Sequence, residues 1–419
     1  MKVKTYPNNL RLVVNTKKDV DVISFKIYVT AGAKDEQVNE YGYAHFLEHM
    51  FFKSTNKTST EELLKKLEDL GTLKNAYTSM SRTCYYFKCM GSVFKQCLQI
   101  FSEMFFNDAF SKDEIEKEKS VILEEYKMGE DNPTKKCVTS AYNSMFDGTI
   151  LGHDVIGTID TIKSVTPQKL LDFKNRLYLP HNVVISVSGN VSFSHAEKLV
   201  KQYFVNNFTQ NQIQPAYKPL DYLPLTIKDR YLAYQKDNMQ SEIYIMYNLG
   251  ELSRHKKIAF NLLFAILGYG MSSKFFETIR GKLGLVYTIA SGCTKICNNF
   301  MAEIIFATSS NNVAHALHNI KQILDDCANG KILQEELVRT KNNFISNLVF
   351  DRESNGAIAE NNALDLIEYS KIISEKQLID EYMAITLEEI IDCAKDVANS
   401  KDYVVTSVGT CTKKDIEAF

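Results

Sequence analysis

Two histidines and a glutamate lie within five residues of one another at positions 45–49, which read His-Phe-Leu-Glu-His. In a helix, at about 100° per residue, His45 and His49 would point about 40° apart, with Glu48 about 60° to the other side of His45. Two neutral imidazoles one turn apart suit a zinc ion, and a carboxylate beside them can accept a proton from water at the metal. The order His-x-x-Glu-His is the inverted form of the zinc-protease helix motif.

The residues around this motif are mostly apolar, and they include Ala44, Phe46, Leu47 and Met50. An unpaired charge on Glu48 would be costly to bury in such a segment, which favours a partner such as a metal ion. The alternative is a surface helix that carries the pattern by chance, because three fixed positions recur about once in several thousand windows. The motif therefore requires a third ligand elsewhere in the chain.

A third ligand is expected on the helix of about 18 residues that follows the capping box Ser111-Lys112-Asp113-Glu114. On this helix Glu118 and Glu125 share one face, because seven residues make nearly two turns, whereas Glu124 points about 120° away from Glu118. Glutamates are common on solvated helix faces. Spacing alone therefore does not choose Glu125 over its neighbours.

The elements that position these residues are strands and helices in turn. Runs rich in β-branched and aromatic residues predict strands at 10–14, 22–30, 72–80, 83–90 and 182–190. Apolar periodicity and capping residues predict helices at 41–53, from Ser59 to a C-terminal Gly71, at 93–105 and from Ser111 to about Gly129.

The second half of the chain partly repeats the first. Residues 27–29 resemble residues 243–245, and residues 186–190 resemble residues 406–410, which indicates a duplicated unit of about 210 residues. At this offset the segment Asn261–Tyr269 lies opposite the motif helix, and it has no metal ligand. Prolines crowd into 210–229, so the expected division is a catalytic domain at 1–209, a linker at 210–228 and a second domain at 229–419.

Composition argues against several classes of protein. With 49 basic and 51 acidic residues the formal charge is −2, so nothing favours nucleic acid or an anionic membrane surface as a partner. Residues 1–9 have no signal or transit pattern and no run of about 18 apolar residues occurs, so we expect a cytoplasmic protein. The nine cysteines are scattered and odd in number, which indicates reduced thiols.

Several motifs together resemble the M16 (pitrilysin-type) zinc metallopeptidases, and in length the chain is similar to the M16B branch, which contains the mitochondrial processing peptidase β subunit and short bacterial peptidases. The matching segments cover nearly the whole chain: residues 45–50, 75–78 and 118–125, Gly157, Gly189 and residues 272–287. The resemblance implies an α+β protein of the M16 and LuxS metallohydrolase type, with two similar domains. Each domain would be a mostly antiparallel β-sheet with helices packed mainly on one face.

By this resemblance His45, His49 and Glu125 would bind one zinc ion per chain, Glu48 would be the general base, and Glu118 would support the site. Three ligands leave the fourth zinc position open for water. The reaction implied is hydrolysis of a peptide bond.

The resemblance also implies substrate contacts. Asn75 and Ala76 match the family's edge strand, on which a peptide lies as an added β-strand, so the expected substrates are short and unfolded. Arg280 and Tyr287 match a pair that contacts substrate and stabilises the developing oxyanion. From the residues alone, Asn75 is interpreted as a turn residue, Tyr287 as core and Arg280 as surface.

In the short members of this family, the arginine-tyrosine pair of one chain faces the zinc of another. The resemblance therefore implies a dimer, with a homodimer expected and a heterodimer as the alternative. A peptide-binding or scaffold subunit without turnover is a second hypothesis, although such subunits usually lack the zinc motif or the pair, and this chain has both. A hydrolase of another kind is also compatible with the motif chemistry, and only the resemblance argues against it.

Overall fold

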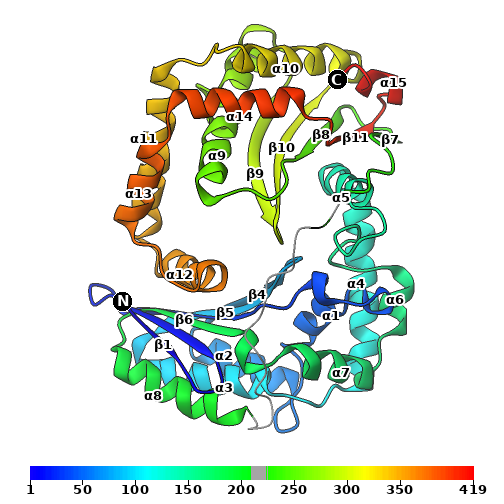
Figure 1. The fold of residues 1–419 in the computed structure, drawn as a ribbon. Coiled ribbons are helices and arrows are strands. Elements are labelled where there is room, and N and C mark those ends of the chain that lie inside the picture. The colour runs from blue at the N-terminus through cyan, green and yellow to red at the C-terminus, as the bar shows by residue number, and fades with distance from the viewer. Residues whose placement is uncertain (209–222, 224) are drawn as a thin grey trace. The chain divides into compact units, whose positions relative to one another are not determined.

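The computed structural model describes residues 1–208, 223 and 225–419, and these form two compact units (Figure 1). Unit 1 comprises Met1–Tyr126, the described residues of 154–218, and Val349–Ile373; unit 2 comprises Lys127–His153, the described residues of 219–348, and Ser374–Phe419. The contiguous division at 1–209 and 229–419 therefore differs from these units in two segments, 127–153 and 349–373. The linker predicted at 210–228 lies largely outside the described residues.

Unit 1 contains a six-stranded sheet in the order β1-β2-β6-β3-β5-β4. The strands are β1 (Lys2–Thr5), β2 (Arg11–Thr16), β3 (Val22–Val29), β4 (Leu73–Thr78), β5 (Thr83–Met90) and β6 (Val183–Gly189). Only β2 and β6 pair in parallel, and the other neighbours are antiparallel. Among the described strands β4 has a neighbour on one side only, so it is an edge strand, as the resemblance implied.

One face of this sheet builds the main core of unit 1. Phe25 and Phe87 stack at 4.9 Å between ring centres, and they pack with buried residues of the flanking helices. The helices of unit 1 are α1 (Tyr43–Met50), α2 (Thr60–Asp69), α3 (Phe94–Phe105), most of α4 (Lys112–Asp131), α6 (Ile159–Ser164), α7 (Pro167–Leu177), α8 (Phe193–Tyr203) and α12 (Asn355–Tyr369).

The opposite face of the same sheet is covered by α12, which comes from the far end of the sequence (Figure 1). This face carries the small, fully buried side chains of Ser24, Ser186 and Ser188, which leave room for a helix to lie close. Asn355 of α12 donates to the backbone carbonyl of Val22 at 3.0 Å. Residues 349–373 therefore belong to unit 1, because their helix buries its apolar side on this sheet.

Unit 2 contains a five-stranded sheet in the order β7-β11-β8-β10-β9. The strands are β7 (Tyr231–Gln235), β8 (Ser241–Asn248), β9 (Thr288–Ile296), β10 (Asn299–Thr308) and β11 (Tyr403–Gly409). This order repeats β2-β6-β3-β5-β4 of unit 1, including the single parallel pair, here β7 with β11. The predicted duplication and the α+β class with two mostly antiparallel sheets are confirmed.

The helices of unit 2 are α5 (Pro133–Met145), α9 (Arg254–Gly268), α10 (Val313–Ala328), most of α11 (Gln334–Asp351), α13 (Glu375–Ala384), α14 (Leu387–Asn399) and α15 (Lys413–Ile416). α5 packs on β11 and β8, where Thr406 donates to the carbonyl of Cys137 at 2.9 Å. Residues 127–153 belong to unit 2 for this reason. In both units one helix from the other half of the sequence covers a sheet face.

Local signals in the sequence correspond closely to the observed element ends. Ser59 accepts the backbone N–H of Glu62 at 3.3 Å and begins α2, and Gly71, with φ +63°, follows its end. Asn132 caps α5 and Pro133 is its first residue. The helix predicted at 41–53 is shorter, because α1 covers only Tyr43–Met50.

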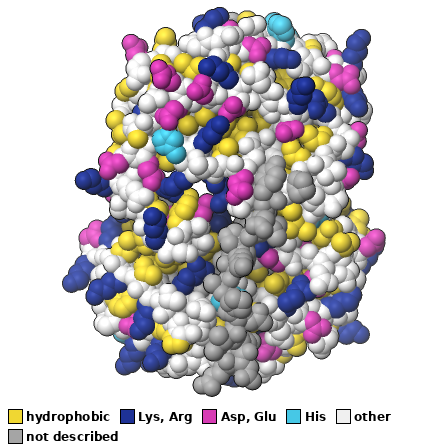
Figure 2. All heavy atoms as spheres, in the orientation of Figure 1, with side chains coloured by type: hydrophobic (Ala, Val, Ile, Leu, Met, Phe, Trp, Pro, Cys, Tyr) yellow, Lys and Arg dark blue, Asp and Glu magenta, His cyan; other side chains and the backbone are white. Residues whose placement is uncertain are grey.

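The cysteines, the surface charge and the helices bear on three broader expectations. All nine cysteines are free thiols, as predicted. On the face drawn in Figure 2, basic and acidic side chains are interspersed rather than gathered by sign. Among the described helices, none combines the length and the apolar character that a membrane span requires.

Candidate metal centre

The helix that carries the motif is anchored at its first turn by a buried carboxylate. Glu36, only 4% exposed, accepts the backbone N–H of Gly42 at 2.9 Å and that of Ala44 at 2.8 Å. Gly42 has φ +92°, and a Cβ atom there would lie 2.4 Å from the carbonyl oxygen of Ile156. These contacts fix where α1 begins and therefore where its histidines lie.

His45, His49 and Glu125 form a group whose ligand atoms all lie within 4.8 Å of one another. The Nε2 atom of His45 is 3.7 Å from Oε1 of Glu125, and Nε2 of His49 is 3.4 Å from Oε2 of the same carboxylate. Two donors on one tetrahedral zinc ion, each at about 2.1 Å from it, would lie roughly 3.4 Å apart. The donor set and its spacing therefore fit a zinc ion, and no other such group is found in the described residues.

Glu118 contacts the second histidine, His49, at the ring nitrogen that is not directed at Glu125. Its Oε1 lies 2.8 Å from Nδ1 of His49, and its Oε2 forms an ion pair with Lys53 at 2.5 Å. Burial opposes ionisation of Glu118, but the hydrogen bonds from His49 and Lys53 lower its pKa below the ordinary value. An ionised Glu118 accepts the proton on Nδ1, which leaves Nε2, on the side of Glu125, as the ring nitrogen that a metal ion can bind.

The protonation of His49 reflects the same surroundings. Burial lowers the pKa of His49, but hydrogen bonds to Glu118 and Glu125 outweigh burial and raise this pKa to about 9. The negative charge of the two carboxylates favours a positive charge between them. A divalent cation bound there would supply this positive charge.

Glu48 lies on the same helix, between the two histidines in sequence, and is held by the edge strand. Thr78 of β4 donates its hydroxyl to Oε2 of Glu48 at 2.7 Å. Burial raises the pKa of Glu48 above its ordinary value, against the opposing effect of the Thr78 hydrogen bond. A carboxylate with a raised pKa accepts a proton more readily, which is what a general base requires.

The two residues predicted to bind substrate lie on the edge strand. In β4, Asn75 is opposite Tyr86 and Ala76 is opposite Tyr85 of β5. The backbone N–H of Ala76 is held by Oδ1 of its own neighbour Asn75 at 2.9 Å. Asn75 is therefore a strand residue, and its interpretation as a turn residue is wrong.

Arg280 and Tyr287 lie together in unit 2. The guanidinium carbon of Arg280 is 5.0 Å from the ring centre of Tyr287 and 4.6 Å from that of Phe276. Tyr287 is 71% exposed, so its interpretation as a core residue is wrong. Arg280 belongs to a π-helix, Phe276–Lys282, which precedes β9.

Three residues that contact the site were given no role by sequence reasoning: Glu36, Lys53 and Thr78. Thr78 lies in a strand that was predicted, and strand alternation with Ala76 could have placed it on the side of α1. Glu36 acts from a 3-10 turn region without periodicity, so no local pattern indicates its partners. Lys53 follows the motif helix, and its role depends on Glu118, which lies more than 60 residues further along the chain.

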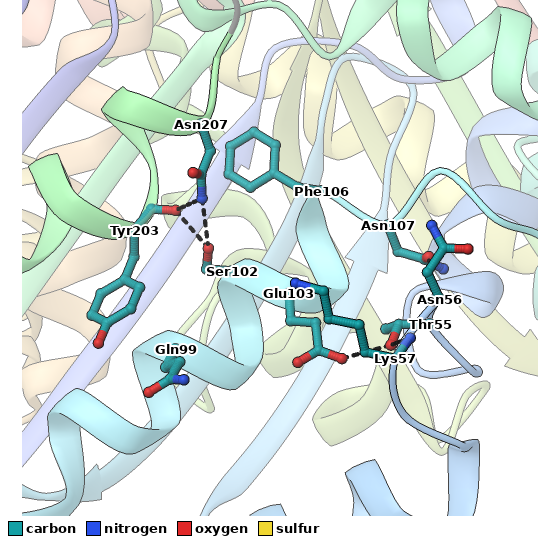
Figure 3. A pocket seen from close by; sticks show the side chains of 10 residues that line it. All are labelled: Thr55, Asn56, Lys57, Gln99, Ser102, Glu103, Phe106, Asn107, Tyr203 and Asn207. Carbon is teal, nitrogen blue, oxygen red and sulfur yellow. Dashed lines mark hydrogen bonds between the residues drawn. The ribbon is translucent and has the colours of Figure 1, made fainter.

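A separate cavity of about 430 Å³ lies among polar side chains of unit 1, and Figure 3 shows the residues that line it. Glu103 accepts the hydroxyl of Thr55 at 2.6 Å, and the amide of Asn207 donates to the carbonyl of Tyr203 at 2.8 Å. None of the metal-centre residues lines this cavity. Its polar groups bond to one another, and we assign it no chemistry.

Comparisons with protein families match two models along the chain. Residues 11–159 match the family described as insulinase (peptidase family M16), and residues 164–344 match the peptidase M16 inactive domain. The label of the second model agrees with the observation that the described residues of unit 2 hold no group of metal ligands.

Individual relatives agree with this assignment. The chain is 27% identical over 404 residues to a Bacillus subtilis protein named uncharacterized zinc protease YmxG, with 96% of this chain and 97% of that one covered. It is also 27% identical over 399 residues to an uncharacterized zinc protease of Rickettsia bellii, with 95% of each covered.

Solved structures share the fold. A protease from Helicobacter pylori superposes with a TM-score of 0.88 at 22% identity, covering 97% of this chain and 99% of that one. A Pseudomonas fluorescens protein described as a peptidase M16 inactive domain superposes with a TM-score of 0.89 at 18% identity, covering 98% of both. Since two family models together span most of the sequence, the chain belongs to the M16 peptidase family.

Proposed function

We propose that this protein is a zinc-dependent endopeptidase that hydrolyses short, unfolded peptides. The observation that carries the proposal is the convergence of His45, His49 and Glu125 within 4.8 Å, with Glu48 beside the two histidines on the same helix. The naming of relatives as zinc proteases supports the choice of metal.

Each residue of the centre has a proposed role. His45, His49 and Glu125 would hold the zinc ion, which when bound polarises the scissile carbonyl and the attacking water. Glu48 accepts the proton of that water and then donates it to the leaving amine, because its pKa is raised and Thr78 keeps its carboxylate in place. Glu118 keeps the ring of His49 in one orientation.

The substrate would lie along β4 as an added strand. Within the part of the chain that the structure describes, this strand pairs only with β5, so its outer edge can form main-chain hydrogen bonds with an extended peptide. Asn75 and Ala76 lie at the middle of the strand. The backbone N–H of Ala76, which donates to the side chain of Asn75, can donate to a peptide carbonyl instead. Folded proteins should be poor substrates, because they cannot offer an extended segment.

We also propose that the protein acts as a homodimer in which Arg280 and Tyr287 of one chain stabilise the oxyanion at the metal centre of the other. Their proximity and the exposure of Tyr287 support a shared role toward a ligand. The test mixes inactive His49→Ala chains with inactive Arg280→Ala/Tyr287→Ala chains. Recovered activity is expected in the mixture, and no recovery in verified mixed dimers would contradict the proposal.

The function itself is tested with an internally quenched peptide, using the full chain with and without a metal chelator. We expect cleavage that stops with chelator, returns with zinc and is lost in Glu48→Gln while zinc remains bound. Bound zinc without any chelator-sensitive cleavage would instead indicate a peptide-binding or scaffold subunit. Cleavage that persists in Glu48→Gln would contradict the role given to this carboxylate.

A further inference from the structure

A carboxylate on α12 connects an inner strand of the unit 1 sheet to its free edge. Oε2 of Glu360 forms an ion pair with Lys26 of β3 at 2.7 Å. The hydroxyl of Tyr77, on β4, donates to Oε1 of the same carboxylate at 3.2 Å. Because β5 lies between β3 and β4, Glu360 spans three strands of the sheet.

The residues near Glu360 lie opposite one another on neighbouring strands of the sheet. Tyr28 lies opposite Cys84, which in turn lies opposite Tyr77, and the hydroxyls of the two tyrosines are 3.3 Å apart. Tyr28 and Cys84 are fully buried, and the side chain of Lys26 is only 7% exposed. An unpaired ammonium would be costly to bury, so the ion pair with Lys26 fixes the carboxylate of Glu360 beside β3.

The edge strand is therefore held from both faces of the sheet. Side chains alternate along a strand, so Tyr77 and Asn75 face α12, whereas Ala76 and Thr78 face the side of α1. On that second side Thr78 donates to Glu48 at 2.7 Å. Neighbouring positions of β4 thus contact α12 through Tyr77 and the proposed general base through Thr78.

Within the described residues, β4 is a strand of six residues whose main chain pairs with β5 alone, so its side-chain contacts add to what keeps it in position. Main-chain pairing with a peptide requires β4 to keep its position, and a strand that is already ordered avoids an entropy cost on binding. We propose that Glu360 is a positioning residue that orders β4 for the peptide. The proposal rests on the peptidase function proposed above, and it assigns to α12 a part in substrate binding.

The test compares Glu360→Gln, Tyr77→Phe and the double variant in the full zinc-loaded chain. A hydrogen bond to a charged group is worth roughly 10- to 150-fold, but only the part of it that orders β4 acts on the peptide, so we expect KM for an extended peptide to rise about fivefold to tenfold. Contacts along β4 are made before and during reaction, so kcat should stay within about twofold. The double variant should raise KM no more than Glu360→Gln alone, because Tyr77 acts on β4 through its contact with Glu360, whereas Glu360→Gln also loses the ion pair with Lys26.

Asn355→Ala is the matched control, since it removes two other hydrogen bonds between α12 and the sheet, to Val22 of β3 and Ser188 of β6. It should leave KM near the wild-type value. The proposal is overturned if Glu360→Gln leaves KM unchanged, if the control raises KM equally, or if the two single effects add.

Hydrogen exchange of residues 73–78 provides a readout that does not depend on catalysis. Faster exchange in Glu360→Gln and Tyr77→Phe, with wild-type exchange in Asn355→Ala, would support the proposal. Equal exchange in all variants would overturn it. If the wild-type chain cleaves no peptide, the proposed function fails, while this exchange experiment still decides whether Glu360 orders the strand.

Discussion

Glu36 offers a sharp test of how the motif helix is positioned. Its carboxylate accepts two backbone N–H groups at the start of α1 and is 4% exposed. In Glu36→Gln only one oxygen remains, and the amide directs a donor at a second donor. Loss of a helix cap and of a charge-assisted hydrogen bond together should cost about 2–3 kcal/mol of unfolding free energy.

Two measurements follow from this magnitude. The melting temperature should fall by about 4–12 °C, given roughly 2–4 °C per kcal/mol for a domain of this size. The helix α1 carries two of the three ligands. If the same free energy is needed to order α1 when zinc binds, zinc affinity should fall about 30- to 150-fold. The assay is competition between the chain and a fluorescent chelator of known affinity, with melting followed by circular dichroism.

Glu40→Gln is the control for this prediction. Glu40 lies four residues further along, pairs with Arg176 at 3.0 Å for its Oε1 atom and accepts the backbone N–H of Gln37 at 3.0 Å. Neither contact is to a residue of α1, so this variant should leave zinc affinity unchanged even if melting falls. Equal zinc affinity in Glu36→Gln and wild type, or equal effects of the two variants, would refute the positioning role of Glu36.

Three further predictions concern single side chains. Thr78→Val removes the donor to Glu48 and should lower kcat about tenfold with zinc content unchanged, measured by steady-state kinetics and metal analysis. Glu118→Ala should weaken zinc about 10- to 100-fold in the chelator competition, because His49 loses its partner. Burial raises the pKa of Glu303, so the folded state disfavours its charged form and stability is lost as pH rises through that pKa. Glu303→Gln should therefore melt above wild type at about pH 8, with the difference shrinking toward about pH 4; a gap independent of pH would contradict this.

Much of the architecture could be predicted because its signals are local. The strand at 83–90 and the helix starting at Ser59 depend on residues next to each other in sequence, such as alternating apolar side chains and an N-cap. The family motifs likewise indicated two similar domains. These features need no knowledge of which distant segments meet.

The parts that could not be predicted depend on long-range packing. Spacing on α4 left Glu125 and its neighbours equivalent, and only the placement of α4 beside α1 brings Glu125 to the histidines. The contiguous domain boundaries missed α5 and α12, because an amphipathic helix does not reveal which sheet it will cover. Glu36 acts through backbone groups, which have no sequence signature.

The central claim is that His45, His49 and Glu125 bind one zinc ion, and zinc stoichiometry of purified variants tests it most directly. We predict about one zinc per chain in wild type and in Glu48→Gln. The metal should be lost in His49→Ala and in Glu125→Ala, with both variants still folded by circular dichroism. A folded Glu125→Ala chain that keeps its full zinc content and affinity would contradict the claim.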